Sequence, residues 1–182
     1  AGQLSAWTEG AFDVASGALV KAWGYVQGPR RVPTEEALQQ ARQQSGFSLV
    51  KLSDPGRFPE VRTVQFLKPG VELNFGSIGK GYALDVVGAW FAEHFPEQPV
   101  LLHGGKSSIL ARGTPPGHSR GWSVTVEHPW QPSGRLTTLY LRDEALATSA
   151  NTFKHVVHAG KKLGHVLNPR TDRKSTRLNS SH

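Results

Sequence analysis

The feature that most constrains the fold is a glycine-spaced stretch near the middle of the chain. From Leu73 to Asp85 it reads Leu-Asn-Phe-Gly-Ser-Ile-Gly-Lys-Gly-Tyr-Ala-Leu-Asp. Glycines at positions 76, 79 and 81 let a ligand approach the backbone and permit positive φ angles. Free N–H groups at a helix start, beside a lysine, bind phosphate oxygens. The stretch therefore predicts a strand over 71–75, a phosphate-binding turn, and a helix that begins near Tyr82.

Two familiar nucleotide motifs do not fit this stretch, and a simpler interpretation stays open. A Walker A loop requires Ser or Thr after its lysine, whereas Lys80 is followed by Gly81. The glycine spacing also differs from that of a dinucleotide-binding fingerprint. A glycine cluster alone is equally typical of an ordinary tight connection between a strand and a helix.

Composition excludes several classes of protein. The 182 residues include no cysteine, which rules out disulfides and thiolate metal sites, and no run approaches a membrane span in length. We also see no signal peptide or membrane anchor in this sequence. The formal net charge is +7, but residues 170–182 contribute four basic residues against one acid, and the other basic residues are scattered. We therefore expect no nucleic-acid partner; an anionic small molecule fits a mildly basic surface equally well.

The first half of the chain alternates between helical and strand patterns. We predict helices over 14–23 and 35–44, the second capped by Thr34 and lying at the surface. Residues 47–52 and 61–67 have strand character. Lys68-Pro69-Gly70 is a turn sequence, so we expect 61–67 and 71–75 to form a hairpin.

The second half begins with the best amphipathic helix, which ends before Pro96. Its apolar positions recur at helical spacing and are expected to be core: Ala83, Val86, Val87, Trp90, Phe91 and Phe95. Strand patterns follow over 100–103, 107–111, 122–127, 135–141, 153–158 and 162–167. The sum predicts an α+β domain, mostly antiparallel sheet with this one major helix packed on it.

The order of several short motifs resembles the FAD:protein FMN transferase family (ApbE family). They are Gly-Ala-Phe-Asp, Leu-Val-x-x-Trp-Gly, Gly-Ser-Ile-Gly-Lys-Gly-Tyr-Ala-Leu-Asp, His-Gly-Gly, Ala-Thr-Ser and His-Val-Leu-Asn-Pro-Arg-Thr. The resemblance covers roughly residues 5 to 173. It implies magnesium-dependent cleavage of FAD, attachment of FMN to a Ser or Thr of an acceptor flavoprotein, and release of AMP. It also implies a cell-envelope or periplasmic location.

The resemblance assigns roles to individual residues. The backbone carbonyl of Ser77 matches a metal ligand, His165 matches a functional histidine, and Gly79 and Lys80 match positions that contact FAD. Ala11, Phe12 and Asp13 match a segment on the adenine or ribose side, and Leu167 matches a pocket wall. Gly104-Gly105 and Thr148-Ser149 look like loops at the pocket rim. Each has a plainer alternative: a lone histidine is often structural, and Asp13 could cap the helix from Val14.

The sequence also departs from the family pattern. Asn168 stands where the family usually has Asp, although Asn keeps the turn chemistry before Pro169. Lys106 replaces an Asp often seen after the paired glycines. The family's acidic and threonine magnesium ligands lie after the Pro-Arg-Thr turn, where residues 174–182 resemble vector or adapter sequence. We therefore expect residues 1–173 to be the central part of a transferase domain, truncated at both ends and inactive alone.

Two other functions stay open at this point. One is a module that holds FAD without catalysis, which the changes at Asn168 and Lys106 make conceivable. The other is hydrolysis of FAD to FMN and AMP, with water replacing the acceptor hydroxyl.

Overall fold

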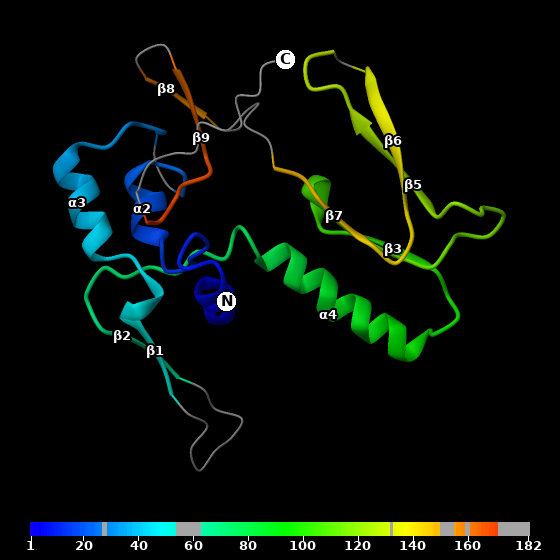
Figure 1. Cartoon of the computed structure of the whole chain (residues 1–182), viewed down its shortest axis with the longest axis horizontal. Coiled ribbons are helices and arrows are strands. Elements are labelled where there is room, and N and C mark those ends of the chain that lie inside the picture. The colour runs from blue at the N-terminus through cyan, green and yellow to red at the C-terminus, as the bar shows by residue number, and fades with distance from the viewer. Residues whose placement is uncertain (27–28, 54–62, 132, 150–154, 159–160, 171–182) are drawn as a thin grey trace. The chain divides into compact units, whose positions relative to one another are not determined.

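In the computed structural model the chain forms two compact units (Figure 1). The first unit comprises Ala1–Phe75 and Ala150–His182, and the second comprises Gly76–Ser149. The structure describes residues 1–26, 29–53, 63–131, 133–149, 155–158 and 161–170. Every strand pair among these residues is antiparallel, so the predicted α+β class is confirmed.

The first unit carries three short helices and two hairpins. Its elements are α1 (Gly2–Trp7), α2 (Gly17–Ala22), α3 (Glu35–Gln43), the 3₁₀ turn η1 (Phe47–Leu49), β1 (Val50–Leu52), β2 (Val64–Phe66), β8 (His155–His158) and β9 (Lys161–Gly164). Thr34 caps α3 as predicted, because its hydroxyl accepts a hydrogen bond from the Ala37 N–H at 3.3 Å. Helix α1 was not expected from the sequence.

The predicted hairpin between 61–67 and 71–75 is wrong. Strand β2 pairs with β1, in the register Val50 to Phe66. Residues 71–75 form no strand; they run beside the segment that leads into α2. The Gly17 N–H donates to Glu72 O at 3.0 Å, and the Asn74 N–H donates to Val14 O at 2.7 Å. This approach needs glycine, because a Cβ on Gly17 would lie 2.5 Å from Glu72 O.

Two small clusters form the core of the first unit. One contains Ala15, Val50 and Val71, with Phe47, Leu49 and Leu73 packed against it. The other contains Ala18, Leu19 and Ala41, with Ala22, Leu38 and Leu167 around it. The two backbone hydrogen bonds between 14–17 and 72–74 thus bring Val71 into the core even though residues 71–75 form no regular strand.

The second unit stacks a helix, a three-stranded sheet and a hairpin. Its elements are α4 (Gly79–His94), β3 (Val100–His103), the 3₁₀ turn η2 (Gly105–Ser107), β4 (Ser108–Arg112), β5 (Trp122–Glu127), β6 (Arg135–Leu141) and β7 (Ala145–Ala147). The sheet has the order β3-β4-β7. Alternate residues of β4 serve its two faces: Leu110 meets Gly88 of α4, whereas Ile109 and Ala111 pack with Leu141 of β6.

Helix α4 is confirmed, but its start and its buried face differ from the prediction. It begins at Gly79 rather than near Tyr82 and ends before Pro96 as expected. The side expected to be core is largely exposed: Val86 is 51% exposed and Trp90 50%. The helix instead lies on the sheet through Gly88, where a Cβ would come 2.6 Å from Leu110 Cδ2. None of the helices in the described part of the chain is long and apolar enough to cross a membrane.

Candidate anion-binding site

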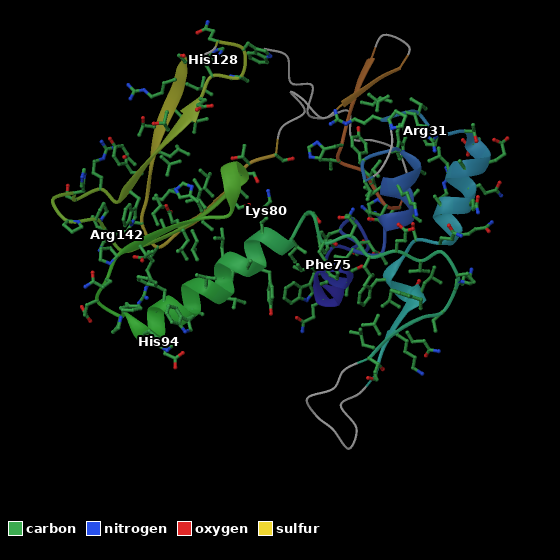
Figure 2. All side chains as sticks on the ribbon, turned by 180° about the vertical axis from the view of Figure 1, so that it is seen from behind. Arg31, Phe75, Lys80, His94, His128 and Arg142 are labelled. Carbon is green, nitrogen blue, oxygen red and sulfur yellow. The ribbon has the colours of Figure 1, made fainter. Side chains whose placement is uncertain are left out.

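The first turn of α4 presents unsatisfied backbone N–H groups beside a cation. The N-cap residue Ile78 gives no side-chain hydrogen bond, and the first intrahelical bond runs from the Tyr82 N–H to Ile78 O at 2.9 Å. The N–H groups of the first turn therefore have no acceptor within the helix. Lys80 lies in this turn and is exposed. Figure 2 labels Lys80 at this end of α4 and His94 at the other end. This end of the helix suits a phosphate or another anion.

The glycines of this loop do not act through positive φ angles, so that part of the prediction is wrong. None of Gly76, Gly79 and Gly81 has a positive φ, and the last two are helical residues of α4. A Cβ built on Gly81 meets no atom within 4 Å. The packing of the protein does not require glycine at position 81, so the space beside Gly81 is open to a bound molecule.

Lys80 joins this turn to a second loop. Its ammonium group donates a hydrogen bond to Ser107 Oγ. Ser107 ends the 3₁₀ turn that begins at Gly105, whose φ of 78° is a left-handed conformation that favours glycine. The Thr148 N–H in turn donates to Ser107 O at 2.9 Å. Three segments predicted to border one pocket therefore meet at Ser107, all within the second unit.

Ser107 is the residue that the sequence did not single out. Its signal was its place two residues after the Gly104-Gly105 pair, which is assigned to the pocket rim. Gly104 packs against Leu84 of α4, with a virtual Cβ 3.3 Å from Leu84 Cδ1, so the loop lies against the helix. This packing holds Ser107 within reach of Lys80.

The predicted adenine-side segment lies in the first unit, where Asp13 has structural partners. Asp13 Oδ1 accepts from the Ala15 N–H at 2.8 Å, and Oδ2 accepts from the Phe47 N–H at 2.8 Å. Asp13 does not cap α2, which begins at Gly17. Through these two hydrogen bonds the Asp13 carboxylate connects the segment before α2 to the start of η1. Ala11 is exposed, and the Phe12 N–H donates to Thr8 Oγ1 at 3.0 Å.

His165 and Leu167 also lie in the first unit, just after β9. His165 is partly buried, and Leu167 packs against the cluster of Ala18, Leu19 and Ala41. The role of His165 and the ligand contacts of Leu167, Gly79, Ala11 and Phe12 stay predictions.

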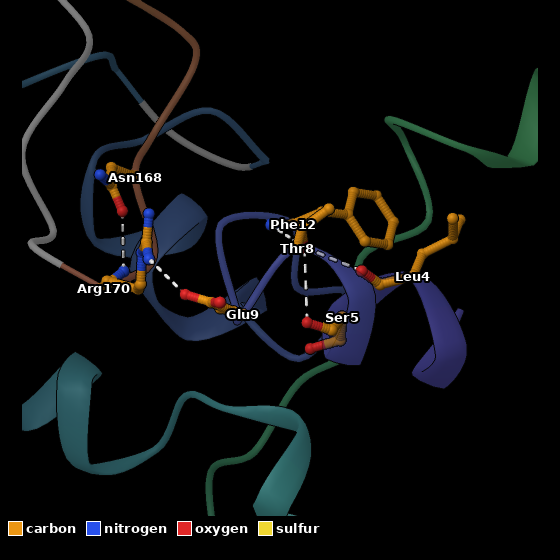
Figure 3. A network of polar contacts seen from close by, with 7 residues as sticks. All are labelled: Leu4, Ser5, Thr8, Glu9, Phe12, Asn168 and Arg170. Carbon is orange, nitrogen blue, oxygen red and sulfur yellow. Dashed lines mark hydrogen bonds and ion pairs between the residues drawn. The ribbon is translucent and has the colours of Figure 1, made fainter.

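The turn after Leu167 keeps the chemistry expected of Asn168. Asn168 Oδ1 accepts from the Arg170 N–H at 3.0 Å, and the Arg170 guanidinium lies 4.0 Å from the Glu9 carboxylate (Figure 3). Figure 3 also shows Thr8 holding the loop after α1 through its bonds to Leu4 and Phe12. Asn168 therefore acts as a turn residue that needs no charge.

The predicted metal ligand has no companions in the described part of the chain. Ser77 is exposed in the turn before α4. No group of three or more His, Cys, Asp or Glu side chains there could hold a metal ion. One backbone carbonyl does not bind Mg²⁺, which takes oxygen ligands in near-octahedral geometry.

Comparison with known proteins places these features in a family context. The ApbE family profile matches residues 1–181. The chain is 30% identical over 172 residues to the FAD:protein FMN transferase of Rhodobacter capsulatus, covering 93% of this chain and 31% of that protein. It is 23% identical over 177 residues to the Escherichia coli K12 protein of the same name, covering 94% of this chain and 48% of that one.

Solved structures agree with this match. The ApbE protein of Thermotoga maritima superposes with a TM-score of 0.77 at 27% identity, covering 95% of this chain and 54% of that one. The flavin transferase ApbE of Vibrio cholerae gives 0.69 at 26% identity, with 94% and 52% coverage. The chain thus spans about a third to a half of the curated relatives that it matches.

Proposed function

Since this chain belongs to the ApbE family, we propose that the complete protein transfers FMN from FAD to a Ser or Thr hydroxyl of an acceptor flavoprotein. The relatives from Rhodobacter capsulatus and Escherichia coli bear the name FAD:protein FMN transferase, which supports this assignment. Because the chain spans at most about half of these relatives, the proposal concerns the whole protein.

One observation carries the proposal: the ammonium group of Lys80 is held by Ser107 at the uncapped start of α4. A pyrophosphate carries its charge on oxygens that accept hydrogen bonds from such groups, a lysine and free backbone N–H donors. Phosphoryl transfer depends on positioning and on neutralising this charge more than on covalent help from the enzyme. The first turn of α4 is therefore the proposed site of the FAD pyrophosphate.

The proposed reaction is a displacement at the phosphorus of the FMN half. The acceptor hydroxyl oxygen forms a new P–O bond, and the bond from that phosphorus to the bridging oxygen breaks. AMP leaves with the bridging oxygen, and the hydroxyl proton passes to a base. Lys80 and the α4 amides would bind and orient the phosphates throughout this step.

Magnesium does not fit the described residues by themselves. The described part of the chain offers the Ser77 carbonyl but no cluster of three or more carboxylates or histidines that could complete a metal site. We propose that the further ligands come from other parts of the complete protein, and no step above depends on the metal. We also propose that His165 is a functional residue in the complete protein. We further propose that the complete protein is located in the cell envelope.

Incubation of the full-length protein with FAD, Mg²⁺ and an acceptor flavoprotein tests the function. Covalently fluorescent acceptor together with free AMP is the expected result. AMP and FMN without labelled acceptor would indicate hydrolysis, and bound but unchanged FAD would indicate a binding module. Either of these two results contradicts the proposed transfer.

A further inference from the structure

Strand β7 has a free edge whose hydrogen-bonding groups can be identified from its ladder. Glu144 and Ala111 exchange two backbone hydrogen bonds, of 3.2 and 2.9 Å, and the Thr148 N–H bonds to Ser107 O. Residues of an antiparallel strand alternate between facing the partner and facing away. The N–H and C=O groups of Ala145 and Ala147 therefore point away from β4. Among the described residues, β4 is the only strand that pairs with β7.

This edge is short, which itself limits pairing, but β7 carries none of the other features that keep a further strand away. Natural edges carry proline, lysine or a bulge, which blocks the approach of a further strand. Strand β7 reads Ala-Leu-Ala, pairs with β4 in regular register, and exposes Ala145 and Ala147. Its outer side is open to an extended segment.

Two open pockets lie between α4 and the sheet. Two cavities, of about 70 and 270 Å³, share Asp85 and Leu110 in their walls. The smaller one is lined by Gly81 and by all three residues of β7, and the larger one by Gly88 and Ala89. Side chains of a strand lying on β7 would project into this space, because Ala145 and Ala147 pair with Leu110 and Ser108 on the α4 side of the sheet.

We propose that the outer edge of β7 binds an extended segment of the acceptor protein, the segment that carries the hydroxyl to be flavinylated. This inference rests on the proposed function. Its basis is continuity with the phosphate site: β7 leads into Thr148, Thr148 bonds to Ser107, and Ser107 bonds to Lys80. A strand added to β7 therefore runs toward the phosphates, where its Ser or Thr meets the reacting phosphorus.

The size of the edge argues for an acceptor rather than for a second copy of this protein. Strand β7 is three residues long, so it offers only a few hydrogen bonds, each of modest net strength. A stable dimer buries roughly 1,200–2,000 Å². A short edge gives the weak, reversible contact that an enzyme needs with a protein it modifies and then releases.

Variants at Ala145 test the proposal in the full-length protein. Ala145→Pro removes an N–H that points outward and leaves the β4 ladder intact, whereas Ala145→Ser keeps the N–H and serves as the matched control. With an acceptor flavoprotein as probe, we expect the proline variant to raise the KM for acceptor at least tenfold. Its Kd for FAD should stay within twofold of the parent, and the serine variant, which keeps the N–H, should raise the KM for acceptor less than the proline variant does. An unchanged KM for acceptor, or a Kd for FAD that rises in parallel, would overturn the proposal.

Hydrogen exchange in the unsubstituted protein gives a second test that does not need turnover. The amides of Ala145 and Ala147 should exchange fast in the protein with FAD alone and slow at least tenfold when the acceptor binds. Slow exchange before acceptor is added would mean that the protein's own chain or a second copy covers the edge, and the inference would fail. If these amides become protected but no FMN is transferred, the strand contact stands and the proposed reaction fails.

Discussion

Lys80 and Ser107 lie 27 residues apart in the sequence, yet their side chains are joined by a hydrogen bond at the start of α4. The bond fixes a flexible ammonium group against a glycine-flanked loop. It turns a helix terminus, which would bind any anion weakly, into a site with a defined cationic partner.

Replacing Lys80 with alanine should weaken FAD binding to the full-length protein. A hydrogen bond to a charged group is worth about 1.5–3 kcal/mol, so we expect a loss of roughly 10- to 150-fold in affinity. Fluorescence titration with FAD measures it, and the melting temperature should hardly change because Lys80 is exposed. Affinity equal to that of the parent would remove the basis of the pyrophosphate site.

Ser107→Ala should act through Lys80. We expect a smaller loss of FAD affinity, roughly two- to tenfold, because the ammonium group stays but is no longer oriented. In a double-mutant cycle, Lys80→Ala with Ser107→Ala should bind FAD no more than twofold worse than Lys80→Ala alone. Fully additive losses would show that Ser107 acts independently of the lysine.

Gly81→Ala should separate stability from binding. The new Cβ meets no atom within 4 Å in a helical position, so the free energy of unfolding should rise by about 0.5–1 kcal/mol. The same methyl group would intrude where phosphate oxygens approach the backbone, so FAD affinity should fall. Urea unfolding and FAD titration measure the two effects.

Gly17→Ala is the contrasting control, because its Cβ would clash with Glu72 O and cost about 1–3 kcal/mol. An unaltered Kd for FAD in Gly81→Ala would place the ligand elsewhere.

Asp13→Ala should destabilise the protein rather than abolish a ligand contact alone. It leaves the N–H groups of Ala15 and Phe47 without their acceptors, at a cost of about 1.5–3 kcal/mol for each bond to a charged group. Asp13→Asn keeps one amide oxygen and should recover part of this loss. Thermal unfolding without FAD checks it; an unaltered melting temperature would restore a purely ligand-binding role.

The cap of α3 predicts a pH effect. The backbone N–H of Glu36, and secondarily the Thr34 hydroxyl, lower the pKa of the Glu36 carboxyl below its ordinary 4.5. A carboxyl whose pKa is lowered by folding stabilises the folded state above its unfolded pKa, and this contribution is lost as the pH falls through the folded pKa. Thr34→Ala should raise the Glu36 pKa part of the way, because the backbone contact remains, and should destabilise α3 by about 1 kcal/mol. An NMR titration of Glu36 measures the shift, and Thr34→Ser should leave it unchanged.

Local signals in the sequence were sufficient for some elements. Thr34 with two acids behind it predicted the start of α3, and Pro96 predicted where α4 stops, because capping and proline act within one turn. Asn168 was correctly assigned to a turn for the same reason. The glycine stretch predicted a turn followed by a helix but placed the helix start three residues late, since glycine is a poor helix former that α4 nevertheless accommodates at Gly79 and Gly81.

What the sequence could not predict depends on contacts between distant segments. Residues 71–75 have strand character, but they meet 14–17 through only two backbone hydrogen bonds, too few for a strand. The apolar residues of α4 lie on several sides, so their spacing did not reveal that Gly88 would face the sheet while Trp90 stays exposed. Ser107 was missed because a serine acquires its role from the lysine it meets.

The contact between Gly88 and Leu110 determines how α4 is oriented on the sheet. Gly88 stands eight residues from Lys80, about 12 Å along the axis at roughly 1.5 Å per residue. A Cβ at Gly88 would force Leu110 Cδ2 to move, and a tilt of α4 by about 5° at this contact would shift its Lys80 end by roughly 1 Å, a displacement that can cost an enzyme about a hundredfold in rate. The orientation of the Lys80 ammonium group thus depends on Gly88, which lies two helical turns away.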